Sequence, residues 1–149
     1  MTAVTYGSSY VYYMVTSKGK LGIDNTSAKQ WAVVGSGDVA EVWFETADNY
    51  GASGTVNAGD NVYLHTSGRD GDDRVLVTRI VGDSMEWSLV RDGGGAQVSS
   101  DGIQNGQPIP VGATVTFSLG SESYIGLGTD GYVADTGTAL PFVPTMTSS

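Results

Sequence analysis

The sequence contains no cysteine, only one histidine and only four prolines. Without cysteine there can be no disulfide framework, no thiolate metal site and no thiol nucleophile. The fold must therefore be stabilised by packing rather than by crosslinks. The single histidine, His65, falls within a strand-like pattern, where an ordinary structural side chain is the expected reading. We therefore predict that the chain is not an enzyme.

Basic residues are scarce, since 7 lysines and arginines face 16 aspartates and glutamates, for a formal net charge of −9. This sign disfavours binding to nucleic acids and to anionic lipid surfaces. No apolar run approaches the roughly 20 residues that a membrane-spanning helix needs, and the N-terminus lacks the basic start and apolar stretch of a signal peptide. We therefore expect a soluble protein with no nucleic-acid or membrane partner, and the cytoplasm is the favoured location.

Glycine, tyrosine, valine and threonine are well represented, with 22 Gly and 8 Tyr among 149 residues. This composition is typical of many short strands joined by tight turns. The longest stretch compatible with a helix, residues 28–34, is short and is followed by Gly35 and Gly37. The length suits one domain. We therefore predict an all-β fold in a single domain, residues 1–149.

A short pattern centred on a glycine occurs three times at nearly equal spacing. It reads VTYGSSYVY around Gly7, VNAGDNVY around Gly59 and IPVGATVTF around Gly112, and the glycines are 52 and 53 residues apart. A fixed period of this length is typical of repeat architectures. The chain therefore divides into three units, approximately residues 1–52, 53–105 and 106–149.

Each unit begins with an alternating segment, at residues 11–15, 62–66 and 115–119, which predicts a strand. A second strand is expected after a turn, at residues 21–23, 75–77 and 124–127, so each pair predicts a hairpin. An aromatic residue follows in each unit and is expected in a shared core: Trp43, Trp87 and Phe142. Trp43 lies further from its glycine than the others do, which we interpret as an insertion in residues 24–37.

Three units of about four short strands would give roughly twelve strands. Threefold repetition that closes on itself removes the exposed sheet edges that invite aggregation. The pattern therefore predicts a β-trefoil. A two-sheet sandwich or jelly roll is the alternative, because it also uses many short strands but requires no fixed period.

Over its whole length this repeat pattern resembles the β-trefoil lectins of the ricin-B type and of the fungal fruiting-body type. The ricin-type signature is Gln-x-Trp near the end of each repeat. Here Gln30 and Trp31 are adjacent, and neither Trp87 nor Phe142 has a glutamine beside it. The resemblance implies a non-catalytic, carbohydrate-binding module. A narrower resemblance, to the lectin-like light subunit of mushroom tyrosinase, implies instead an accessory subunit of a larger enzyme with little or no sugar binding.

Sugar binding requires an apolar plane for stacking on a pyranose and polar groups for its hydroxyls. In trefoil lectins such sites lie once per repeat, near the second and third strands. Two units pair acids or amides with an aromatic there: Asp24, Asn25 and Trp31 in the first unit, and Tyr132 with Asp135 in the third. We predict carbohydrate binding at these residues, and a neutral glycan is favoured because the protein is acidic. The alternative is that both rings are core or rim side chains and that the acids cap turns.

A tyrosine-rich segment, Tyr10, Tyr12 and Tyr13, is the candidate protein interface. Alternation in a strand must expose at least one of these rings, and tyrosine is enriched at protein interfaces. This segment would serve the accessory-subunit hypothesis. A protease inhibitor, a third class known among fungal trefoils, would carry an inhibitory loop signature that this chain lacks.

The densest charge cluster, residues 69–74 (RDGDDR), offers carboxylate oxygens of the kind that calcium prefers. It lacks the ligand order of an EF-hand loop, and its arginines provide local ion pairs. We therefore expect a solvated hairpin turn, with no metal and no cofactor.

Overall fold

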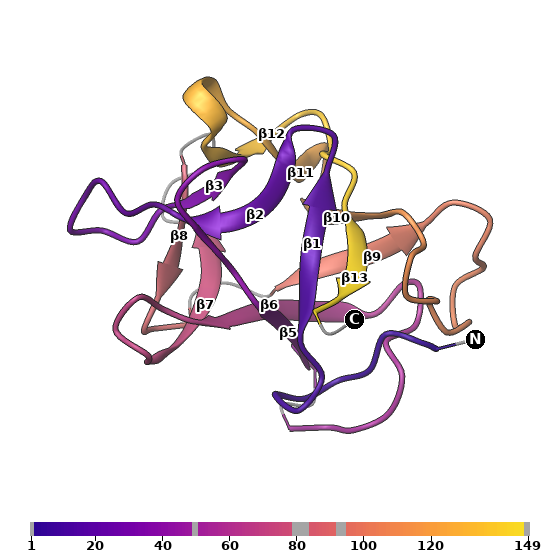
Figure 1. The fold of residues 1–149 in the computed structure, drawn as a ribbon. Helices are drawn as coiled ribbons and strands as arrows, with labels where there is room; N and C mark the ends of the chain where they lie inside the picture. The colour runs from indigo at the N-terminus through magenta and orange to yellow at the C-terminus, as the bar shows by residue number, and fades with distance from the viewer. Residues whose placement is uncertain (1, 49–50, 79–83, 92–94, 148–149) are drawn as a thin grey trace.

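The computed structural model describes residues 2–48, 51–78, 84–91 and 95–147, and its regular secondary structure is almost entirely β-strand (Figure 1). The prediction of an all-β chain is confirmed. The described strands are β1 (Tyr12–Thr16), β2 (Gly19–Ile23), β3 (Ala32–Val34), β4 (Asp38–Val39), β5 (Val42–Thr46), β6 (Asn61–Ser67), β7 (Asp73–Thr78), β8 (Met85–Ser88), β9 (Ala96–Ser100), β10 (Val115–Gly120), β11 (Ser123–Leu127), β12 (Val133–Thr136) and β13 (Val143–Met146). A 3₁₀ turn, η1 (Thr129–Gly131), precedes β12.

The strands pair in antiparallel fashion in the order β12-β11-β10-β9-β6-β5-β1-β2-β3. The last strand, β13, pairs with β1, where Met14 lies opposite Pro144, and the two strands run side by side in Figure 1. Just before β13, Phe142 exchanges two backbone hydrogen bonds with Val115 of β10, at 2.7 and 2.8 Å. Pairing therefore leads from β1 through β5, β6, β9 and β10, and back through β13 to β1.

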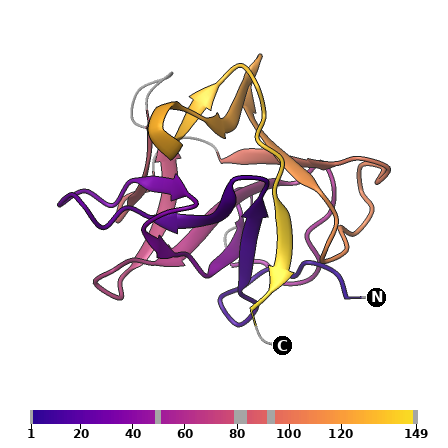
Figure 2. The ribbon, with the colours of Figure 1, turned by 45° about the horizontal axis from the view of Figure 1, so that its top comes forward.

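Three hairpins, β2–β3, β7–β8 and β11–β12, lie off this path and contact one another (Figures 1 and 2). Each hairpin is joined to the other two by isolated bridges, which are Trp31 with Glu86, Val33 with Tyr132, and Ser84 with Ala134. The residue between the bridging positions is buried in every hairpin: Ala32, Met85 and Val133. The three hairpins therefore share one apolar junction.

The backbone bonds around the repeated glycines explain why the pattern recurs. The N–H of Val4 donates to Ile109 O, that of Ile109 to Val56 O, and that of Val56 to Val4 O, at 2.8, 3.0 and 2.8 Å. Three residues after each of these lies a repeated glycine, with φ of +107° at Gly7, +91° at Gly59 and +96° at Gly112. Glycine adopts positive φ without steric cost. The repeated glycine therefore marks a repeated turn.

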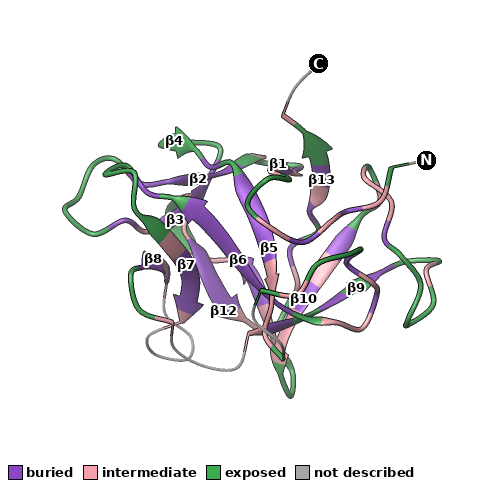
Figure 3. Cartoon of the chain, turned by 90° about the horizontal axis from the view of Figure 1, so that it is seen from below, coloured by how far each residue is buried: buried purple, intermediate pink, exposed green. Residues whose placement is uncertain are grey.

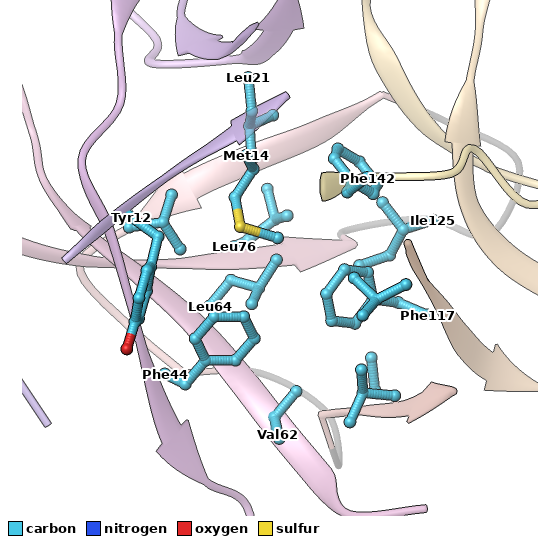
Figure 4. Close-up of a cluster of buried hydrophobic side chains, with 14 of the residues drawn as sticks. Tyr12, Met14, Leu21, Phe44, Val62, Leu64, Leu76, Phe117, Ile125 and Phe142 are labelled. Carbon is cyan, nitrogen blue, oxygen red and sulfur yellow. The ribbon is translucent and has the colours of Figure 1, made fainter. Parts of the chain in front are cut away.

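One large core cluster takes side chains from along the whole described chain, from Val4 to Phe142 (Figure 4). Phe117 lies between Phe44 and Phe142, with ring centroids 6.3 and 5.7 Å away. Such aromatic pairs add about 0.5–1.5 kcal/mol beyond the burial of their area. Figure 3 shows buried residues along most strands and exposed residues in the loop between β2 and β3.

Trp43, Trp87 and Phe142 are all buried, as predicted, but Trp43, which is 7% exposed, lies outside the main core cluster. Trp87 and Phe142 are completely buried within the core cluster. Trp43 points to the other face of β5, because its neighbour Phe44 takes the core position, and its ring stacks on His65. Trp87 lies on a hairpin strand, β8, whereas Trp43 lies on β5. Trp43 and Trp87 lie at unequal distances from their glycines because they belong to different strands of their units. The longer spacing of Trp43 is therefore no evidence of an insertion.

Candidate functional site

The end of the β2–β3 hairpin brings Asp24 and Trp31 together, as the sequence predicts. The N–H of Asp24 donates to Trp31 O at 2.8 Å, so the two residues lie opposite each other where the strands separate. Trp31 is half-buried, and the Nζ atom of Lys29 lies 5.3 Å from its ring centroid. Asn25 is exposed and donates through Nδ2 to Asp38 Oδ1 at 3.1 Å. The three predicted residues of the first unit therefore share one hairpin end.

The carboxylate of Asp24 is buried, with 5% of the residue exposed. Its Oδ1 atom accepts hydrogen bonds from the N–H of Thr26 at 3.1 Å and from the Thr26 hydroxyl at 2.8 Å. Its Oδ2 atom is also buried and has no hydrogen-bond partner among the described residues. An unsatisfied buried acceptor costs about 1–3 kcal/mol. A donor that reached Oδ2 would therefore be favoured.

Gln30 holds the 24–31 loop in place and does not face outward. Its side chain is buried, and Oε1 accepts a hydrogen bond from the N–H of Arg69 at 2.9 Å. Its backbone oxygen accepts from the N–H of Trp87 at 2.8 Å. Arg69 in turn donates through Nη2 to Ser27 O at 2.8 Å. Gln30 thus joins the loop to the β6–β7 turn and to β8.

The third unit does not assemble the predicted pair of Tyr132 and Asp135. Residues three apart along a strand point to opposite faces. Tyr132 is half-buried at the hairpin junction, where its backbone bridges Val33. Asp135 is buried and accepts a hydrogen bond from the Ser123 hydroxyl on the neighbouring strand β11. The acid is therefore committed to a partner within the sheet, away from the tyrosine ring.

The tyrosine-rich segment divides between the core and the surface. Tyr12 is 2% exposed, packs against Phe44 and accepts a hydrogen bond from the N–H of Thr5 at 2.9 Å. Tyr13 is half-buried on the outer face, with Lys20 Nζ 4.4 Å from its ring centroid, and Tyr10 is 51% exposed. Alternation turns Tyr12 inward, so of the three residues of the predicted interface Tyr10 and Tyr13 reach the surface.

The carboxylates of the 69–74 segment point to different partners. Asp70 pairs with Arg74, with Nη2 and Oδ2 2.7 Å apart, and this contact, together with the N–H of Asp72, lowers the pKa of Asp70 from 3.8 to about 2. Asp73 Oδ1 instead lies 2.7 Å from His65 Nδ1. Among the described residues, no group of three His, Asp or Glu side chains is placed to hold a metal ion.

His65 is buried between aromatic rings on the outer face of β6. Its ring stacks on Trp43 at 5.5 Å and meets Tyr63 edge-on at 6.5 Å. A pocket of about 220 Å³ beside it also contains Ser88. Val75 lies between His65 and Ser88 in the sheet, and Ser88 Oγ accepts a hydrogen bond from the N–H of Val90 at 3.1 Å. His65 and Ser88 therefore lie on strands that β7 separates.

A second pocket, which the sequence reasoning missed, lies on the outer face of β1, β5 and β6. Its walls include Tyr13, Glu41 and Trp43. Val11 and Tyr13 are two residues apart, as are Glu41 and Trp43, and such positions share one face of a strand. Treating Trp43 as a core residue concealed this signal.

No family model, curated protein or solved structure matches the chain. The residues of the chain itself therefore carry the argument about function. In the described part of the chain, helical structure long and apolar enough to cross a membrane is absent.

Proposed function

We propose that the chain is a β-trefoil. The path of strand pairing that returns to β1 supports this fold, because six strands in such a path correspond to a barrel. The three mutually bridged hairpins correspond to the cap of that barrel. The ring of hydrogen bonds among Val4, Val56 and Ile109 supplies the threefold relation that the 52- and 53-residue spacing predicts.

Within this fold, we propose a non-catalytic, carbohydrate-binding function at the end of the β2–β3 hairpin. The observation that carries the proposal is the buried, unpartnered Oδ2 atom of Asp24, a residue whose backbone pairs with that of the half-buried Trp31. Trp31 offers an apolar plane to the C–H face of a pyranose, and Oδ2 accepts a hydrogen bond from a sugar hydroxyl. Because Oδ2 is covered, the 24–31 loop must open slightly to admit that hydroxyl.

A neutral glycan fits this hairpin better than an acidic one. Asp24 and Asp38 both lie at the hairpin, and the whole chain carries a formal charge of −9. Lys29 Nζ, 5.3 Å from the Trp31 ring centroid, is a cation at the same hairpin, but the net negative charge repels carboxylated or sulfated sugars. One site rather than three is proposed, because Ser84 takes the bridging position of Trp31 in β7–β8 and Asp135 bonds to Ser123 in the third unit.

A glycan array of the recombinant protein, with and without calcium, tests this function. We expect binding to a related set of neutral glycans, independent of calcium. Trp31→Ala should weaken binding at least tenfold, since it removes the stacking surface, while the far-UV circular dichroism stays unchanged. Tyr132→Ala is the matched control, because Tyr132 is a half-buried aromatic at the corresponding bridging position of β11–β12. Equal retention of wild type and Trp31→Ala on the bound sugar would overturn the proposal.

The second candidate is an accessory subunit of a larger enzyme, such as a tyrosinase. It is favoured by large apolar or aromatic side chains that are 48–60% exposed: Tyr10, Val39, Leu89, Val90 and Met146. Isolated exposed residues of this kind are common. Their partner is sought by native co-purification, and a blank glycan array with a stable larger complex would select this function.

A further inference from the structure

The outer-face pocket, defined above on β1, β5 and β6, has a volume of about 390 Å³. Tyr12 pairs with Val42, and Val42 pairs with Thr66, so the residues next to them, Tyr13, Glu41 and Ser67, follow one another across three strands. Ser8, in the turn after Gly7, closes one side. The remaining lining residues are Val11, Val39, Trp43 and Thr66.

Four polar side chains of this pocket make no hydrogen bond to any other described residue: Ser8, Tyr13, Glu41 and Ser67. Other polar groups in the wall are already used. Trp43 donates through Nε1 to Glu45 Oε2 at 3.1 Å, and the Thr66 hydroxyl donates to Glu41 O at 2.8 Å. Several unused polar groups that converge beside an apolar surface are the usual composition of a small-ligand site.

The charges at the pocket limit the class of ligand. Lys20 Nζ lies 4.4 Å from the Tyr13 ring centroid, so a cation already occupies that aromatic face and repels a second one. Glu41 is exposed within the pocket and repels an anion. Hydroxyl groups can satisfy both Glu41 and the serines, because a hydroxyl donates as well as accepts. A neutral, polyhydroxylated ring therefore suits this pocket best.

The fold does not require this combination of residues. The repeated glycines Gly7, Gly59 and Gly112 donate to the carbonyls of Phe44, Val98 and Pro144, at 2.9, 2.7 and 2.8 Å. The residue before each acceptor is Trp43 in the first case, and Gln97 and Val143 in the other two. Two residues earlier still, the chain has Glu41, Gly95 and Pro141. Of the three segments that accept these glycine hydrogen bonds, only the one bonded to Gly7 therefore combines an aromatic residue with a carboxylate.

We propose that the outer-face pocket is a second carbohydrate site, which binds the ring of a neutral saccharide between Trp43, Tyr13 and Glu41. It goes beyond the hairpin site and does not depend on it, since the two sites share no residue. Glu41 accepts hydrogen bonds from ring hydroxyls, and Ser8 and Ser67 donate to or accept from them. Val11 and the edge of Trp43 contact the apolar C–H face.

The three tryptophans allow the two sites to be tested in one experiment. Trp31 reports on the hairpin, Trp43 on the outer-face pocket, and Trp87, which is completely buried, serves as an internal control. The ¹⁵N-labelled protein is titrated with glucose, galactose, mannose and N-acetylglucosamine to tens of millimolar, and the indole N–H signals are followed. Trp31→Phe and Trp43→Phe assign these signals. We expect a saturable change in the chemical shift of the Trp43 signal with at least one sugar, while the chemical shift of the Trp87 signal stays unchanged.

Glu41→Gln tests the role of the carboxylate without removing a contact within the described fold. It should weaken the binding seen at Trp43 about tenfold and leave any binding seen at Trp31 unchanged. Glu122→Gln, an exposed acid on the β10–β11 turn, is the matched control and should leave both signals as in wild type. A shift at Trp31 without one at Trp43 would overturn this inference and leave the hairpin function standing. A shift at Trp43 alone would support this inference and overturn the hairpin function. The absence of any shift would overturn both.

Discussion

Tyr6 is a buried residue whose hydroxyl group is hydrogen-bonded to a carboxylate. Its hydroxyl donates to Asp60 Oδ2 at 2.7 Å, and the same oxygen accepts from the N–H of Asn57 at 3.0 Å. Burial, followed by the hydrogen bond and the charge of Asp60, raises the pKa of Tyr6 far above its usual value near 10. The folded protein therefore keeps this phenol protonated at a pH where an unfolded chain ionises it.

Tyr6→Phe should lower the free energy of unfolding by about 1.5–3 kcal/mol at pH 7, the usual value for a hydrogen bond to a charged group. Because the folded pKa is raised, the contribution of Tyr6 is fully present below pH 10 and is lost as the pH rises above it. The difference in the free energy of unfolding between wild type and Tyr6→Phe should therefore become smaller from pH 10 upward. Urea unfolding at several pH values measures it, and a gap that stayed constant to pH 11 would contradict the assignment.

Single positions were also where the sequence was least informative. The sequence singled out Trp43 as the core aromatic of the first unit, but it does not show which of Trp43 and Phe44 faces the main core, since both are large and apolar. Asp24 and Asp135 looked alike in the sequence as acids near an aromatic. They differ because Ser123 pairs with one of them, a contact between strands that no local pattern encodes.

At the scale of the elements, the first two strands of each unit were the most predictable. The expected segments 62–66 and 75–77 lie within β6 and β7, and 115–119 lies within β10. Alternation and turn residues are local signals, so they can be recognised in the sequence without knowledge of the fold. The strands β3, β8 and β12 were missed as a set. Their residues are buried by the other two hairpins, so they lack the alternation of a strand with one exposed face.

The turn between β3 and β4 contacts the turn between β1 and β2 through Gly35. Gly35 has φ of +75°, and an added Cβ would overlap the backbone oxygen of Lys18. Gly71, on the β6–β7 turn, has φ of +83°, with open space where its Cβ would lie. The two glycines therefore share the conformational requirement but differ in the clash.

Gly71→Ala should cost about 1–2 kcal/mol from the left-handed conformation alone. Gly35→Ala should cost about 1–3 kcal/mol more, because the hairpin must move away from Lys18. Thermal unfolding of both variants gives the difference directly. Equal losses in the two variants would show that the contact between the turns does not stabilise the fold.

For the whole molecule, the core draws on both ends of the chain, and single-domain behaviour is a prediction to be tested. Phe142 is completely buried and lies 5.7 Å from Phe117 by ring centroids. Phe142→Ala should lower stability by about 3–5 kcal/mol. If the chain is one cooperative unit, tryptophan fluorescence and far-UV circular dichroism should give the same lowered midpoint. Separate midpoints for the two probes would indicate independently folding parts.

The all-β class of the molecule could be predicted from composition and from alternation within strands. The glycines spaced 52 and 53 residues apart, Gly7, Gly59 and Gly112, are visible in the sequence, and all three adopt positive φ in the structure. The residues of the proposed binding sites give no such recurring signal. The proposed sites each occur once, on positions where the three units differ, so the repeat gives no information about them.

The pairing of β13 with β1 has a consequence for synthesis. A ribosome releases β1 early, but the strand that pairs with one of its edges is made only after almost all of the described chain has emerged. Until then that edge of β1 offers unpaired N–H and C=O groups to other nascent chains. Completion of the fold therefore waits for the synthesis of β13, and the yield of native protein should depend on how many chains are being made side by side.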